Sequence, residues 1–448
     1  MKYCRKTITL LALLCAALVI VPLFCACGNT GNGTATTQGN DSTETDAPGK
    51  TDAAPDYIDE NGDLSIVMNG EGVFTVVRGE FASDANVATA VSLYKRIFDE
   101  TGVRPTIRTC FVFPYETDID SVPEIIVGDT SRKETASLTE KISDNQFAVK
   151  ISGCKIVIAA SSDLVLQAAV DYFFDNFVTS IGDGKMTVKN DVEYYSDPSV
   201  NYLEKILRSG AELESKVSRI VAVGAPTSSI KTPQGGYFDG RYFYQIFIQK
   251  DTNSNEADNV DRIVKYDVKN KKVEKISGDL DLNHANDIAY NPKTNQLVIV
   301  HNNPNRTRVT LVDPETLEAV GVQTLPESIY CMDYNEEHDL YVVGLSGGQD
   351  FRFLDKDFKV ASGVFKATSA TKGYVTQGMT CDDDFIYFVL YKENVITVYD
   401  WSGKFVTLIK FDVGSIEPEN ISAVNGEIYV VCAQNGATMY KITPKAAK

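Results

Sequence analysis

Five polar side chains recur at one position of a repeated strand-and-turn pattern in the second half of the chain. Each stands five residues before a turn dipeptide, and they are Gln234, Asn286, Tyr330, Gln377 and Asn420. The turns are Asp239-Gly240, Asn291-Pro292, Asn335-Glu336, Asp382-Asp383 and Asn425-Gly426. Equivalent positions of repeated units face a common centre when the units close into a ring. The spacing therefore predicts a ring of polar groups at one mouth of a central channel.

Further titratable groups flank this ring. His284 and Asp287 neighbour Asn286, and Glu417 and Glu419 precede Asn420. Amides and carboxylates can satisfy sugar hydroxyls, and a tyrosine ring offers an apolar face to a pyranose. We expect the ligand-binding residues to be Gln234, Asn286, Tyr330, Gln377, Asn420, His284 and Asp287. The alternative is a wet channel mouth where these groups hydrogen-bond only water and each other.

Catalysis at the same mouth would need a pair of carboxylates. Asp287 with Glu417 or Glu419 could supply the pair of a glycoside hydrolase or lyase, and His284 is an alternative base. The same oxygens could hold a cation, but no EF-hand-like spacing is present. Binding is favoured over catalysis, because Glu417 and Glu419 bracket a proline just outside the strand, where exposed carboxylates are common.

Motifs for other chemistries are missing. Gly344-Leu345-Ser346-Gly347-Gly348 lacks the strand–elbow–helix context of a serine nucleophile, and no phosphate-binding or nucleotide-binding glycine motif occurs. His301 and His338 fall in or beside turns, where solvent-facing or capping roles are expected. The sequence therefore predicts no cofactor.

Cysteine spacing gives no sign of a metal site or a disulfide framework. The five cysteines beyond the leader are Cys110, Cys154, Cys331, Cys381 and Cys432. Their number is odd, and no CxxC or His-bearing zinc spacing occurs. We expect buried free thiols and no metal, with oxidation of one pair, such as Cys110 with Cys154, as the alternative.

The repeat that positions the polar ring spans residues 218–443. Its turns recur every 43 to 52 residues, close to the length of a propeller blade. A second landmark ends a later strand of four repeats, at Tyr266-Asp267, Val312-Asp313, Leu354-Asp355 and Tyr399-Asp400. The fifth repeat stops one strand short, and residues 218–223 are expected to complete it. The pattern predicts an all-β five-bladed β-propeller followed by a tail, 444–448.

An α+β domain is expected before the repeat, over residues 57–200. Strand-like runs lie at 64–67, 73–77, 105–113, 124–128, 146–151 and 155–160, with helical periodicity at 84–100 and 162–178. The order predicts one mixed sheet covered by helices, with the first two runs as a hairpin. A linker helix is expected within residues 201–217.

Two parts of the chain resemble known families. Pro123 to Arg132, Phe147–Ile151, Lys155–Ala160 and the helix with Val170 to Phe174 resemble the small α/β domain before the catalytic barrel of family 20 hexosaminidases and some α-glucuronidases. This resemblance covers residues 57–190 and implies an ancillary role in handling polysaccharides. No barrel follows here, because alternating helices are absent. Gln234-Gly235-Gly236, His284 to Asp287, Gln377-Gly378-Met379 and Glu417 to Asn420 resemble secreted bacterial propeller proteins without assigned chemistry.

The amino-terminal segment resembles a bacterial lipoprotein signal. Lys2, Arg5 and Lys6 precede an apolar run that leads to Ala26-Cys27. The resemblance implies a signal peptide, residues 1–26, and a lipid on Cys27; an uncleaved anchor is the alternative. Residues 27–56 are predicted to be a disordered tether. Both alternatives place the remainder outside the cytoplasm, at the bacterial surface.

Composition limits the partners. The net charge of −18 argues against nucleic acid, whose phosphates need a basic surface. We therefore expect a lipid-anchored extracytoplasmic protein that binds a glycan or cell-envelope polymer at the propeller mouth. The alternatives are a propeller-based glycoside hydrolase or polysaccharide lyase, and a protein-interaction scaffold.

Overall fold

The computed structural model describes residues 56–182, 184–210, 212–249, 260–345, 350–366 and 375–445. The leader, Cys27 and all but the last residue of the expected tether lie outside the described residues. Within the described part, strands predominate over four α-helices. None of those helices is long and apolar enough to cross a membrane.

The first folded region holds two sheets and three helices. A four-stranded sheet has the order β2 (Glu71–Gly72), β1 (Leu64–Met68), β9 (Lys185–Val188), β8 (Val178–Gly182). A six-stranded mixed sheet has the order β10 (Val192–Tyr195), β6 (Phe147–Ser152), β7 (Lys155–Ala160), β5 (Glu124–Val127), β3 (Thr75–Arg78), β4 (Thr106–Thr109). Strands β7, β5, β3 and β4 run parallel, whereas β6 and β10 are antiparallel to their neighbours.

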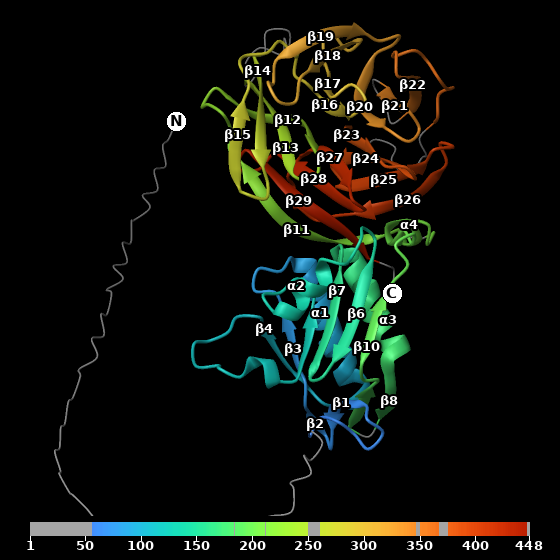
Figure 1. Ribbon diagram of the computed structural model, residues 1–448. Helices are drawn as coiled ribbons and strands as arrows, with labels where there is room; N and C mark the ends of the chain where they lie inside the picture. The colour runs from blue at the N-terminus through green and yellow to red at the C-terminus, as the bar shows by residue number, and fades with distance from the viewer. Residues whose placement is uncertain are drawn as a thin grey trace, which may run out of the picture. The chain divides into compact units, whose positions relative to one another are not determined.

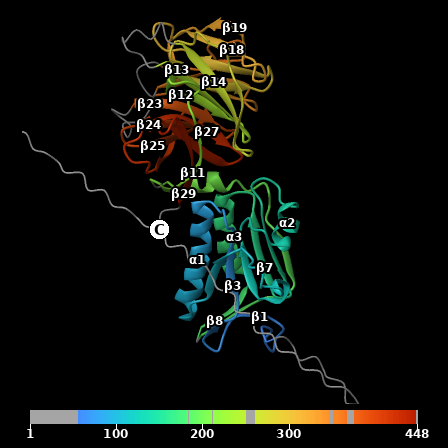
Figure 2. The ribbon, with the colours of Figure 1, turned by 90° about the vertical axis from the view of Figure 1, so that its left-hand side faces the viewer.

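The helices of this region cover both faces of the six-stranded sheet. Figure 2 shows α1 (Asp84–Thr101) and α3 (Asp163–Phe177) on one side and α2 (Lys133–Thr139) on the other. Helix α1 begins where the Ser83 side chain accepts from Asn86 N and ends at the left-handed Gly102. Its Ala90, Leu93 and Ile97 join the buried core. The predicted helices at 84–100 and 162–178 are confirmed.

The expectation of a single sheet with an initial hairpin is wrong. Asn69-Gly70 does turn the chain, but the returning strand β2 has only two residues. The chain then crosses to the other sheet, where β3 pairs in parallel with β4 and β5. Parallel pairing buries β3 on both faces, which explains its continuous run of valines.

Five small antiparallel sheets follow in the described residues from Glu214 to Lys445. Four of them are β12 (Ile230–Phe238) to β15 (Lys272–Ile276), β16 (Asp287–Asn291) to β19 (Ala319–Thr324), β20 (Ile329–Asn335) to β22 (Phe351–Asp355), and β23 (Val375–Cys381) to β26 (Phe405–Lys410). Their middle strands are β13 (Tyr242–Gln249), β14 (Asp261–Asp267), β17 (Gln296–Val300), β18 (Arg308–Val312), β21 (Leu340–Leu345), β24 (Phe385–Tyr391) and β25 (Val395–Asp400). The fifth sheet has the order β11 (Glu214–Val223), β29 (Ala437–Lys445), β28 (Glu427–Cys432), β27 (Pro418–Val424).

The first strands of the sheets contact one another in a closed circuit, β12 to β16, β20, β23, β27 and back to β12. Figure 1 shows these five strands grouped at the centre of their part of the molecule. Each junction carries a hydrogen bond: Gly235 N to Ala285 O (3.2 Å), Met332 N to Asp287 Oδ2 (3.2 Å), Cys381 N to Asp333 Oδ2 (2.8 Å), Ala423 N to Thr380 Oγ1 (3.2 Å) and Phe238 N to Ser422 Oγ (3.1 Å). Sheets arranged radially around a central circuit define a β-propeller.

The ring is closed by pairing of its first and last strands. β11 pairs antiparallel with β29, so the expected role of residues 218–223 is confirmed. The strand begins earlier than expected, at Glu214, because helix α4 spans only Tyr202–Leu207 and the left-handed Gly210 follows it. This closure leaves β11 rather than β28 or β29 as the outer edge of the fifth sheet.

The repeated Asp and Asn residues act as turn formers. The Oδ1 atoms of Asp313, Asp355 and Asp400 each accept two backbone N–H bonds from the turn that follows. The same device occurs at Asn291 and Asp382 after first strands. Carboxylate and amide side chains favour such turns, which is why they mark the repeat in the sequence.

Candidate functional site

Irregularities in strand pairing position the polar residues of the channel mouth. Tyr330, Gln377 and Glu419 each lie at a one-residue register shift between the first and second strands of a sheet. Gln234 lies in the corresponding shift between Pro233 and Gly236. Such β-bulges leave one residue outside the ladder and redirect its side chain. A bulge therefore recurs in four of the five first strands, which we call the inner strands.

Two of these side chains, Tyr330 and Gln377, form a hydrogen-bonded chain with Glu417, and Glu419 is their electrostatic neighbour. Tyr330 donates its hydroxyl to Gln377 Oε1 at 3.4 Å, and Gln377 Nε2 donates to Glu417 Oε1. Burial raises the pKa of Tyr330 to about 12, and Glu417 and Glu419 act in the same direction. We name Tyr330, Gln377, Glu417 and Glu419 the mouth cluster.

The two glutamates of the mouth cluster have raised pKa values. Glu419 is only 7% exposed, and burial, together with the negative charge of Glu417, raises its pKa well above the usual range. Burial also raises the pKa of Glu417, although its hydrogen bond from Gln377 opposes the shift. A carboxyl group with a raised pKa can donate a proton near neutral pH. The mouth cluster therefore combines hydrogen-bond donors and acceptors in one partly buried group of side chains.

Arg306 adds a positive charge that the sequence pattern did not indicate. Its guanidinium lies 5.6 Å from the centre of the Tyr330 ring, and its Nε donates to Asn302 Oδ1 at 2.7 Å. The residue comes from the loop between β17 and β18, outside the aligned first strands. Only a search of the loops at the same mouth could have found it.

Asp287 and Asn420 lie beneath the surface. Asp287 is 0% exposed, and its carboxylate accepts from Ile288 N, Met332 N and Met379 N. Burial raises its pKa well above the usual range, and the nearby Asp333 adds to the effect. Asn420 is 1% exposed and donates weakly to Gln234 O at 3.4 Å. These contacts give both residues a structural role between the inner strands.

Glycines make room for this buried layer. A Cβ atom on Gly235 would lie 2.6 Å from the Asp287 backbone, and one on Gly236 would lie 2.6 Å from Asn420 Nδ2. A Cβ atom on Gly378 would lie 2.9 Å from Asn420 Cα. The glycines beside Gln234 and Gln377 thus permit close approach of neighbouring inner strands.

The segment before β16 carries the other expected site residues. Asn283, His284 and Ala285 all have positive φ angles, of 50°, 74° and 34°, which is strained for residues other than glycine. His284 is half-buried, whereas Asn286 is buried and its Nδ2 has no hydrogen-bond partner among the described residues. His284 and Asn286 belong to the segment that leads into β16, whereas the residues of the mouth cluster come from β20, β23 and the start of β27.

The remaining histidines have structural partners. His301 is fully buried, contrary to the expected solvent-facing role, with Nδ1 3.0 Å from Asn283 Oδ1 and Nε2 2.8 Å from Thr310 Oγ1. Burial lowers its pKa to about 4. This buried contact holds the strained segment in place. His338 stacks against Trp401 and contacts Asp383 O at 2.9 Å, which agrees with the capping role.

The cysteines have the expected state. All five described cysteines are buried and free, so the prediction of buried thiols is confirmed. No group of three or more His, Cys, Asp or Glu residues in the described part of the chain is arranged to hold a metal ion.

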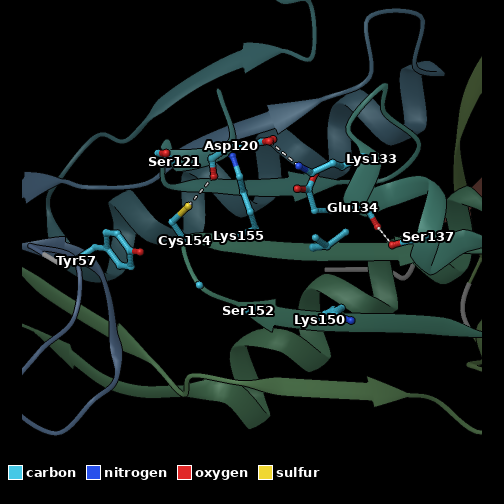
Figure 3. Close-up of a pocket in the computed structure, with 12 residues that line it drawn as sticks. Tyr57, Asp120, Ser121, Lys133, Glu134, Ser137, Lys150, Ser152, Cys154 and Lys155 are labelled. Atoms are coloured by element: carbon cyan, nitrogen blue, oxygen red, sulfur yellow. Dashed lines mark hydrogen bonds and ion pairs between the residues drawn. The ribbon is translucent and has the colours of Figure 1, made fainter. Parts of the chain in front are cut away.

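A wide hollow in the α/β region is a second candidate, but its three lysines, Lys133, Lys150 and Lys155, are already paired. Figure 3 shows Lys133 directed at Asp120 (2.6 Å) and Lys155 beneath the loop that carries Asp120 and Ser121. Lys155 Nζ donates to two backbone carbonyls and to Glu124, which also pairs with the buried Arg132. Lys150 pairs with Glu193 at 3.1 Å. The mouth cluster, with its titratable and aromatic groups, is therefore the better site.

The fold defines a β-propeller protein, and comparisons with known proteins add no family. No protein-family model matches the sequence, and no curated protein matches it. Glutaminyl cyclase from Myxococcus xanthus aligns over 53% of this chain and 100% of its own, with 10% identity and a TM-score of 0.39. The β-propeller domain of Cps50 (Swd1) from Myceliophteria thermophila aligns over 52% of this chain and 100% of its own, with 8% identity and a TM-score of 0.32.

Proposed function

We propose that this chain is a lipid-anchored extracytoplasmic protein whose five-bladed propeller binds a glycan or cell-envelope polymer at the mouth cluster. The five small sheets and their closed circuit support the blade number. The leader sequence supports the anchor and the location. The α+β region before the propeller would serve as an ancillary domain.

One observation carries the binding proposal. The bulges place Tyr330, Gln377 and Glu419 at equivalent positions of three successive inner strands, and hydrogen bonds link Tyr330 through Gln377 to Glu417. Sugar recognition needs amide and carboxyl groups for hydroxyls and an aromatic face for the ring carbons. The positively charged Arg306 beside Tyr330 would also accept an acidic sugar.

A polysaccharide-binding assay tests this proposal. The purified full chain is applied to immobilised plant, host and cell-wall polysaccharides, and retention is compared with that of Gln377→Ala and Tyr330→Ala. We expect at least one polymer to be retained without turnover, and each substitution to weaken its binding about tenfold, the loss of roughly 1.4 kcal/mol. The matched control is Gln323→Ala, on the exposed outer strand β19. Retention that survives both mouth substitutions would contradict the proposal.

The second candidate function is glycoside hydrolysis or lyase chemistry at the same cluster. The observation that favours it is the raised pKa of the buried Glu419 beside Glu417. A protonated carboxyl next to a second carboxylate is the arrangement of a general acid with a base or nucleophile. Glu417 and Glu419 would then be the catalytic pair, with Gln377 orienting Glu417.

Product analysis separates the two candidates. New reducing ends or unsaturated sugars from a bound polymer, abolished by Glu419→Gln and reduced by Glu417→Gln, would establish the enzyme. Glu419→Gln keeps the volume and the hydrogen-bonding capacity of the side chain but cannot transfer the proton. Binding without any product, in wild type and both variants alike, would establish the binder.

A further inference from the structure

A second hollow lies at the point where the parallel sheet of the α/β region changes direction. From β3 the chain runs through α1 to β4 on one side, and from β5 it runs through α2 toward β6 and β7 on the other. The loops that leave the carboxyl ends of β3 and β5 therefore diverge. Ligands of open α/β sheets bind in the crevice that forms at such a point.

The loops that diverge here do enclose a crevice. A hollow of about 460 Å³ is lined by Gly79 to Ser83 after β3 and by Asp129 to Ser131 after β5, with Asn86, Cys110 and Asp163 completing it. This volume falls in the range of small-molecule sites. Gly79 lets the two loops meet closely, since a Cβ there would lie 2.4 Å from Asp129 O.

One buried polar group of the hollow has no partner. Asn86, in the first turn of α1, is only 7% exposed, and its Oδ1 has no hydrogen-bond partner among the described residues. The side chain is held against Gly128, where a Cβ would lie 2.2 Å from Asn86 Nδ2. An unsatisfied buried carbonyl oxygen is destabilising, and a ligand that donates a hydrogen bond to it would remove that cost.

An aromatic ring stands free at the rim of the same hollow. Phe81 is 93% exposed although it lines the hollow. A ligand with an apolar face that covers this ring removes it from water, which favours binding.

The charges of the hollow exclude anions. Glu80 and Asp129 are exposed there, and Asp163 accepts from Ser83 Oγ at 2.6 Å and pairs with Lys441. The hydroxyl groups of Thr130 and Ser131 also line it, where Thr130 pairs with Thr135 Oγ1 and Ser131 donates to Cys110 O, so that both keep hydrogen-bonding capacity for a ligand. An acidic, hydroxyl-rich hollow with an aromatic rim suits a neutral or positively charged polyhydroxy ligand, and repels phosphate.

We propose that the hollow between the β3–α1 and β5–α2 loops is a binding site for a neutral or amino sugar unit, with Asn86 as acceptor and Phe81 stacked on the sugar ring. The site is separate from the mouth cluster and uses none of its residues. It gives the ancillary domain a binding activity of its own.

Cys110 provides a readout from inside the hollow. Burial raises the pKa of this thiol, but hydrogen bonds from Ser131 and Glu80 and the charge of Arg132 outweigh that effect and lower it. Cys110 lines the hollow and is only 4% exposed, so we expect an alkylating reagent to reach it from this side. A sugar bound there would shield it.

The test measures the rate at which iodoacetamide alkylates Cys110 in the purified full chain, with glucose, glucosamine or inorganic phosphate added. We expect glucose and glucosamine to slow the reaction about tenfold in a saturable manner, and phosphate to leave it unchanged. Phe81→Ala is expected to raise the sugar concentration needed for half-protection about tenfold. Asn86→Leu is expected to abolish protection, because the acceptor is lost.

The controls keep the result independent of the propeller. Tyr115→Ala removes a ring that is 76% exposed but does not line the hollow, and should leave protection intact. Gln377→Ala should also leave it intact. Absence of saturable protection by either sugar, protection by phosphate, or protection unchanged in Phe81→Ala would overturn the proposal. Because Phe81 is exposed, its variant remains informative even if Asn86→Leu fails to fold.

Discussion

The polar residues near the propeller axis differ in burial, and the difference separates two roles. Asp287 and Asn420 are fully buried and hold inner strands together through backbone contacts. Tyr330, Gln377 and Glu417 keep some exposure and contact each other through their side chains. The second set can meet a ligand without disruption of the ring, whereas Glu419, only 7% exposed, belongs to the mouth cluster as a buried neighbour of Glu417.

At this scale the structure predicts which cysteine reacts first. Cys110 has a lowered pKa, whereas burial raises the pKa of Cys154, Cys331, Cys381 and Cys432. Since the thiolate is the nucleophile, iodoacetamide near neutral pH should label Cys110 before the other four. Mass spectrometry of peptides at short labelling times measures the order. Earlier labelling of Cys154, which is also in the α/β region, would contradict the prediction.

The sequence predicted part of the mouth cluster and missed part of it for a geometric reason. Counting back from the turns identified Tyr330 and Gln377 but selected Asn420, where the bulge places Glu419. The bulge residue lies five residues before the turn at Tyr330 and at Gln377 but six residues before it at Glu419. Turn position alone cannot reveal such a difference in strand length. Arg306 escaped because loops carry no periodic signal.

At the scale of elements, glycines determine how closely the inner strands pack. Gly235→Ala should lower the free energy of unfolding by about 1–3 kcal/mol, because the new Cβ would meet the Asp287 backbone at 2.6 Å. Gly363→Ala is the matched control, since nothing lies within 4 Å of its Cβ position. Urea denaturation of both variants measures the difference. Equal stability of the two variants would contradict this account of the packing.

Closure of the ring by β11 and β29 can be trapped chemically. Lys216 and Thr443 are directly opposed in that pairing, so cysteines at both positions should form a disulfide on mild oxidation. The crosslink spans a long loop and should stabilise the fold by about 2–4 kcal/mol. Thermal melts with and without reductant measure the gain. Cysteines at Ala222 and Ile442, which are not opposed, should not crosslink efficiently.

Strand periodicity predicted the propeller better than it predicted the α/β region. In the propeller, four of the five sheets are meanders of sequence-adjacent strands marked by Asx turns, and the fifth adds β11 from the start of the ring, so local signals suffice for most of the fold. In the α/β region, β1 pairs with the distant β9, and β3 lies between β4 and β5. Such pairings depend on long-range packing of apolar faces, which one sequence does not record locally.

Across the whole molecule, buried acids make stability depend on pH. Burial raises the pKa of Asp261 to about 7 and those of Asp333 and Asp382 to about 6. Because these values lie above the unfolded value of 3.8, the folded state binds protons more tightly. The resulting stabilisation is fully present below about pH 4 and is lost as the pH rises through about 6 to 7.

Melting temperatures measured from pH 4 to pH 8 check this expectation. The contribution of these three groups should make the wild type melt at a lower temperature as the pH rises. Asp261→Asn should flatten that dependence, because a difference of one between the folded and unfolded pKa of a group corresponds to about 1.4 kcal/mol. Asp412→Asn, at an exposed position, should leave the slope unchanged. A slope that Asp261→Asn does not alter would show that another group governs the dependence.

The pairing of β11 with β29 also bears on how the protein is made. The first of these strands leaves the ribosome long before the second, and every other sheet of the ring is synthesised between them. Completion of the ring is therefore a single late event with very high contact order. Until that moment the nascent chain exposes unpaired strand edges, so its folding should depend on chaperones that shield these edges.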